Sequence, residues 1–123
     1  MGSAVASYRD LLVWQAAVDL AVACYSHTGS FPRNEEFGLT SQIRRAATSI
    51  AANIAEGNGR ESTGVYVQFL RISQGSLKEL ETHLIVATKV GMMNEEAAAG
   101  LLKRTEDIGK MLRALIRTLQ KRS

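Results

Sequence analysis

The chain has 123 residues, of which 22% are charged, and its formal net charge is +3. This length accommodates a single domain, residues 1–123, because two cores of this combined size would each be marginal. One proline and seven aromatic residues argue against a turn-rich β-sandwich. One cysteine excludes an internal disulfide framework and a metal site built from several cysteines, and it indicates a reducing compartment.

The first predicted helix covers about residues 8–28, with Ser7 or Asp10 as its N-cap. It contains the most apolar stretch of the chain, residues 11–25, which includes two polar residues. That stretch is too short and too polar to span a bilayer. The residues before it lack the basic and apolar regions of a signal peptide. We therefore expect a cytoplasmic protein that makes no membrane contact.

Cap residues predict three further helices. Asn34 and Asn94 each precede two glutamates, and a short polar cap followed by acidic residues suits the positive end of a helix. Ser62 or Thr63 provides a cap between them. The expected ranges are about 34–57, 62–91 and 94–121.

The apolar spacing agrees with this division. In the last predicted helix, residues from Leu101 to Leu119 alternate steps of four and three, the period of a coiled-coil seam. The two preceding helices carry one apolar stripe each, and Gly57 and Gly91 are suited to the left-handed conformation that ends a helix. Short connections make consecutive helices antiparallel. The sequence therefore predicts an all-α, antiparallel, up-down-up-down four-helix bundle.

The first predicted helix has more apolar surface than one bundle can bury. Leu12, Trp14 and Val22 belong to an apolar set that surrounds this helix, whereas a bundle covers only one side of it. The last helix has a second row as well, formed by Leu102, Gly109 and Ile116. We therefore predict a homo-oligomer that uses these surplus faces as its interface.

Positive charge is concentrated near the C-terminal end. Residues 103–122 contain seven basic and two acidic residues, a net charge of +5, whereas the rest of the chain carries −2. Several of these basic residues are spaced by three and four, so they share a helix face. Two interpretations stay open: contact with nucleic-acid phosphates, or a solvated face that maintains solubility. The candidate RNA- or DNA-binding residues are Lys103, Arg104, Lys110, Arg113 and Arg117.

Arg44 and Arg45 are adjacent on the second predicted helix, about 100° apart, and cannot share a face. One interpretation is an ion pair, either inside the subunit with Glu56 or a glutamate of the third helix, or between subunits. The other is contact with phosphate.

Residues suited to catalysis are few and scattered. Neither His27 nor His83 has the glutamate three positions earlier that a di-iron bundle requires. The glycines at 57 and 59 follow a helix rather than a strand and match no nucleotide-binding pattern. Cys24 lies in an apolar run and is expected to be an inert core thiol. We therefore predict a protein without catalytic residues, metal or cofactor.

The stretch from Gln42 to Arg60 resembles the bacterial 23S rRNA intervening-sequence protein family, and further similar stretches extend the resemblance over about residues 8–118. The resemblance implies a ring of five four-helix bundles, a homopentamer. Similar proteins, the accessory variability determinants of diversity-generating retroelements, bind nucleic acid and partner a reverse transcriptase. Packing, capping or intersubunit roles are implied for Trp14, Arg44, Arg45, Asn53, Glu56 and Gly57.

The expected function is weak, largely sequence-independent binding of RNA or DNA by such a ring, through the basic last helix. The alternative is an oligomeric scaffold for a protein partner, without a nucleic-acid role.

Overall fold

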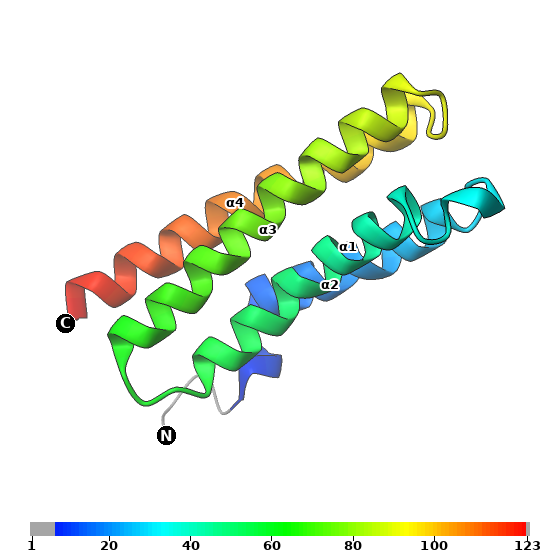
Figure 1. The fold of residues 1–123 in the computed structure, drawn as a ribbon. Helices are drawn as coiled ribbons and strands as arrows, with labels where there is room; N and C mark the ends of the chain where they lie inside the picture. The colour runs from blue at the N-terminus through cyan, green and yellow to red at the C-terminus, as the bar shows by residue number, and fades with distance from the viewer. Residues whose placement is uncertain (1–6, 123) are drawn as a thin grey trace.

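The structure is a computed structural model that describes residues 7–122. Within this range the chain forms four α-helices and no strand (Figure 1), which confirms the predicted all-α four-helix bundle. The expectation that no signal peptide is present rests mainly on residues 1–6, which lie outside this range. The helices are α1 (Leu12–Thr28), α2 (Leu39–Asn58), α3 (Thr63–Lys89) and α4 (Glu95–Arg122).

The helices form two antiparallel pairs, α1 with α2 and α3 with α4 (Figure 1). The bundle closes because α2 packs on α3 and α1 packs on α4. The connections inside the two pairs lie at one end of the bundle, and the loop from α2 to α3 lies at the other end. Each pair therefore presents its own outer surface.

The core is formed by one apolar stripe from each helix. Leu20, Ile50, Leu80 and Leu112 are fully buried, one from each helix. The seam predicted for α4 is confirmed along most of its length, but near its end Ile116 is more deeply buried than Leu115. An α-helix of 3.6 residues per turn drifts against a 3.5-residue pattern, so the buried position moves by one residue. Among the described residues, no helix is long and apolar enough to cross a membrane.

The first helix begins later than predicted, at Leu12 rather than near residue 8. Ser7 does act as a cap, because its Oγ accepts a hydrogen bond from the Arg9 backbone N–H at 3.0 Å. The element that it caps is a single turn of 3₁₀ helix, η1 (Tyr8–Asp10). The extended backbone of Leu11 then separates this turn from α1.

The second helix begins at Leu39 rather than at residue 34. Residues Arg33–Glu35 form another 3₁₀ turn, η2, and Gly38 has a non-helical backbone. The Leu39 N–H donates to Glu35 Oε1 at 3.0 Å. A glutamate of the preceding turn therefore satisfies an N–H of the first turn, and Asn34 is not the cap.

The predicted limits of α3 and the start of α4 are confirmed by cap hydrogen bonds. Ser62 Oγ accepts from the Val65 N–H at 3.3 Å, and Asn94 Oδ1 accepts from the Ala97 N–H at 2.7 Å. Gly91 has a φ of +83° just beyond α3. There the Met92 N–H donates to the Ala87 carbonyl at 2.9 Å and the Gly91 N–H to the Thr88 carbonyl at 3.1 Å, a Schellman motif.

The predicted role of Gly57 as a left-handed helix end is wrong, because this residue lies inside α2. It allows α2 to approach α3 closely. A Cβ atom at this position would lie 2.7 Å from Phe69 Cβ and 3.0 Å from Tyr66 Cδ1. Both distances are too short for a side chain, so the packing of the two helices requires glycine here.

Hydroxyl groups join α2 to α3 further along the same contact. Ser73 Oγ, which is fully buried, donates to the Ile50 carbonyl oxygen at 2.9 Å. The Ser49 and Ser76 hydroxyls are 2.9 Å apart and form a second hydrogen bond. Small side chains therefore provide both the close approach and its polar links.

Candidate nucleic-acid interface

The outer side of α4 carries three cations at helical spacing, Lys110, Arg113 and Arg117. All three are exposed, and among the described residues none of them forms an ion pair. Steps of three and four residues place them on one side of the helix, over about 10 Å of its length. We call these three residues the basic face.

The other two predicted nucleic-acid-binding residues differ from these three in their surroundings, although Lys103 lies two turns before Lys110 on a similar side of α4. Lys103 Nζ is 2.6 Å from Asp107 Oδ1, and the hydrogen bond and charge of this carboxylate raise the pKa of Lys103. Arg104 lies toward α1, where it lines a small hollow with Asp19 and Asp107. Among the described residues, three of the five predicted residues thus form one exposed row without ion pairs, whereas Lys103 is paired with Asp107 and Arg104 lies toward α1.

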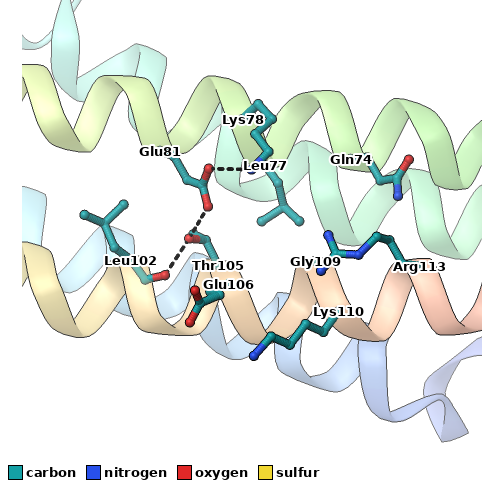
Figure 2. A pocket seen from close by; sticks show the side chains of 10 residues that line it. All are labelled: Gln74, Leu77, Lys78, Glu81, Leu102, Thr105, Glu106, Gly109, Lys110 and Arg113. Carbon is teal, nitrogen blue, oxygen red and sulfur yellow. Dashed lines mark hydrogen bonds and ion pairs between the residues drawn. The ribbon is translucent and has the colours of Figure 1, made fainter.

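An open groove of about 590 Å³ lies between α3 and α4, beside the basic face (Figure 2). Lys110 and Arg113 belong to both the basic face and the groove. Small-molecule sites typically enclose about 300–1,000 Å³, so the groove is large enough for a ligand of that size. Its lining residues are Gln74, Leu77, Lys78, Glu81, Leu102, Thr105, Glu106, Gly109, Lys110 and Arg113.

Glu81 is the most constrained charged group of the groove. Its side chain is 22% exposed, it accepts a hydrogen bond from Thr105 Oγ1 at 2.7 Å, and it pairs with Lys78 at 3.1 Å. Figure 2 shows this carboxylate reaching from α3 to α4 across one part of the groove. The Glu81–Thr105 bond therefore joins the two helices, and Lys78 offsets the negative charge.

Gly109 keeps the middle of the groove open. A Cβ atom there would lie 3.6 Å from Arg113 Nη1 and 4.0 Å from Leu77 Cδ1, which are ordinary contact distances. The Arg113 side chain extends back over Gly109 (Figure 2). Sequence reasoning assigned Gly109 to an apolar row and missed the groove, although a glycine one turn before an arginine on a basic helix is a signal for such a hollow.

The α1–α2 pair holds its arginines differently. The Arg44 guanidinium carbon lies 4.5 Å from the centre of the Tyr25 ring, and Arg44 Nε donates to Thr28 Oγ1 at 2.9 Å. Glu56 pairs instead with Arg60 at 2.8 Å, so the predicted ion pair of Glu56 with Arg44 or Arg45 is wrong. For the exposed Arg45, intersubunit pairing and phosphate contact both stay predictions.

Exposed apolar side chains occur on both helix pairs, including Ile72 and Val90 of the α3 region, and the most exposed ones belong to the α1–α2 pair and its connection. Leu12 is 70% exposed, Val22 64% and Phe37 90%. Val18, Val22 and Ala51 line a shallow, largely apolar hollow between the two helices. The single subunit therefore leaves uncovered part of the apolar surface that the sequence places on the first helix.

The remaining residues implied by the family resemblance have structural contacts. Trp14 packs edge-on against Tyr8 with ring centres 5.2 Å apart. Asn53 Nδ2 donates to the Ser49 carbonyl at 2.8 Å and to the Ser49 hydroxyl at 3.0 Å. Arg60, the partner of Glu56, also lies over an aromatic ring of α3. These contacts stabilise α1, α2 and the start of α3.

The cysteine and the histidines do not line the groove. Cys24 is fully buried, and burial raises the pKa of its thiol to about 11, so it stays protonated at neutral pH. His83 Nε2 lies 3.6 Å from the Glu79 carboxylate, on another side of α3. Among residues 7–122, no group of three or more His, Cys, Asp or Glu side chains could hold a metal ion.

Fold and surface together define a four-helix-bundle protein with an outer basic helix and a charged groove beside it. Residues 9–114 match the family of the 23S rRNA-intervening sequence protein, and the chain belongs to this family.

A crystal structure of a protein of unknown function from the S23 ribosomal protein family, from Bacteroides thetaiotaomicron, has a similar fold. The TM-score is 0.77 at 25% sequence identity, and the match covers 85% of this chain and 98% of the other. A search of curated proteins found no match.

Proposed function

We propose that the protein is a homo-oligomer that binds the backbone of RNA or DNA through the basic face of α4. The observation that carries this proposal is the placement of Lys110, Arg113 and Arg117 on one exposed side of a helix, without acidic partners among the described residues. Cations that are free of carboxylates can neutralise phosphates and release their counterions.

The geometry favours backbone contact over sequence recognition. Three cations along about 10 Å of helix can contact a short run of successive phosphates of one strand, and they offer no groups that read base edges. Each such contact is weak, and several copies of the face in one assembly multiply the affinity. Five copies form the assembly that we propose, the number implied by the family resemblance.

The uncovered apolar surface supports the assembly. Val22 and Phe37 are mostly exposed in the single subunit, and contiguous apolar surface on a protein commonly marks an interface. Light scattering during size-exclusion chromatography at micromolar concentration measures the mass directly. A species of 13.4 kDa would contradict the oligomer, because this is the mass of one chain.

Nucleic-acid binding is tested by charge reversal with a matched control. Fluorescence anisotropy of a structured RNA, measured over a range of salt concentrations, should show binding at low salt that weakens steadily as salt rises. The double variant Arg113→Glu/Arg117→Glu should lose most of this binding and have a shallower salt dependence.

The control variant is Arg9→Glu/Arg33→Glu, which makes the same change in net charge at exposed arginines far from α4 in the sequence. It should retain most of the affinity. Absence of binding by the unmodified protein at low salt, or equal loss in both double variants, would reject the basic face as the binding site.

An oligomeric scaffold for a protein partner is the second candidate, supported by exposed apolar residues of the α3 region, Ile72, Ile85 and Val90. Capture of partners from the native cell extract, with and without nuclease, separates the two functions. Nuclease should release partners that are held through nucleic acid and leave those held through a protein interface.

A further inference from the structure

The groove and the basic face differ in charge, although they share Lys110 and Arg113. The lining of the groove carries both signs, with Glu81 paired to Lys78 and with Glu106 near Lys110 and Arg113, whereas the basic face continues to Arg117 and includes no carboxylate. Phosphate is attracted most strongly where cations are not offset by carboxylates, along the basic face. A bound strand therefore places its phosphates on the basic face, and the groove suits an uncharged part of the nucleotide.

The lining of the groove has the chemistry that an unstacked base requires. Leu102 and Gly109, which are partly exposed, offer an apolar surface to a planar ring, with the buried Leu77 behind them. The Gln74 amide and the Glu106 carboxylate can form hydrogen bonds with the edges of a base. The Arg113 guanidinium, which extends over Gly109 in Figure 2, presents a planar group for stacking.

We propose that this groove binds one unpaired base of a single-stranded nucleic acid whose phosphates lie on the basic face. The inference rests on the proposed function and adds that the site selects single-stranded over double-stranded nucleic acid. A base inside a duplex is paired and stacked and cannot enter the groove, whereas a base in a single strand or loop can. The protein therefore prefers single strands and loops to duplexes.

The test compares a short unstructured RNA with the duplex of the same sequence, by fluorescence anisotropy at one salt concentration. The full chain should bind the single strand at least about fivefold more tightly, the lower range for stacking one base on a protein side chain. A fluorescent base analogue in the single strand should change its emission on binding.

Filling the groove gives the decisive variant. Gly109→Leu adds a side chain where a Cβ atom makes only ordinary contacts, so the fold is retained, which circular dichroism verifies. Its affinity for the single strand should fall by a larger factor than its affinity for the duplex, which is affected only through the nearby Arg113, and the emission change should disappear. The matched control is Gly100→Leu, at an exposed glycine of α4 outside the groove, which should alter neither affinity.

The outcomes separate this inference from the proposed function. If the protein binds neither RNA, the proposed function itself fails. If it binds both forms equally and Arg113→Glu/Arg117→Glu weakens both, the basic face is supported and the base-binding groove is rejected. An equal loss of both affinities in Gly109→Leu also rejects the groove as a base site.

Discussion

The two helix pairs use the same residue type, a buried threonine, for opposite electrostatic links. In the α1–α2 pair, Thr28 Oγ1 accepts a hydrogen bond from the cationic Arg44. In the α3–α4 pair, Thr105 Oγ1 donates to the anionic Glu81. A hydroxyl group can either accept or donate a hydrogen bond. A buried threonine can therefore hold a cation in one helix pair and a carboxylate in the other.

The outer surfaces differ accordingly. The fixed arginine of the first pair stacks on Tyr25 beside exposed apolar residues, whereas the second pair presents a charged groove and unpartnered cations. The apolar stripes determine only which residues face inward, so the outer residues of each pair can diverge without disturbing the bundle. The proposed ligand contact lies on the second pair, whereas exposed apolar residues for the proposed self-association occur on both pairs.

The largest expected effect comes from breaking the contact that joins the two pairs. Gly57→Ala places a Cβ atom 2.7 Å from Phe69 Cβ, so α2 and α3 must move apart. We expect a loss of about 2–3 kcal/mol in the free energy of unfolding, measured by urea denaturation. Gly75→Ala is the control, because an added Cβ there meets nothing within 4 Å, and it should stabilise α3 by about 0.5–1 kcal/mol. Equal effects of the two substitutions would contradict the close packing at Gly57.

A smaller effect is expected from removing the cationic link of the first pair. Arg44→Ala deletes the contact with the Tyr25 ring and the hydrogen bond to Thr28, and should lower the free energy of unfolding by about 1–2 kcal/mol. Thermal and urea unfolding measure this change. The neighbouring Arg45→Ala should change it by less than about 0.5 kcal/mol, because that side chain is exposed. If Arg45→Ala lowers the free energy of unfolding more than Arg44→Ala does, Arg44 is not the arginine that links α1 to α2.

The smallest effect is expected for the anionic link of the second pair. Thr105→Val keeps the shape of the side chain and deletes the hydroxyl bonded to Glu81, while Lys78 remains as a partner for this carboxylate. The loss should be about 1 kcal/mol. Thr118→Val, at an exposed position of α4, provides the comparison and should be nearly neutral. If Thr105→Val lowers the free energy of unfolding more than Arg44→Ala does, the anionic link contributes more stability than the cationic one, contrary to this prediction.

Much of the fold could be predicted because the signals that define each helix lie within a short stretch of its own sequence. Apolar spacing and the caps at Ser62, Asn94 and Gly91 depend on neighbours in sequence, and the structure confirms them. The starts of α1 and α2 were harder to predict. Ser7 and Asn34 lie beside single 3₁₀ turns whose local signals resemble those of an α-helix.

The candidate site was predictable only in part. The basic face follows from spacing along one helix, and so does the pairing of Lys103 with Asp107 four residues later, whereas the position of Arg104 depends on the approach of α1. The groove requires two helices whose lining residues are far apart in sequence. The partner of Arg44 is sixteen residues away, across a turn, and a glutamate was an equally reasonable expectation.

The serine hydrogen bonds between α2 and α3 also determine how the groove can respond to a ligand. Sliding α3 by one helical turn, about 5.4 Å, would leave both the Ser73 and Ser76 hydroxyls without their partners on α2. These two bonds lock the axial register of α3. A molecule that enters the groove therefore contacts, on its α3 side, a helix that is held from behind by α2.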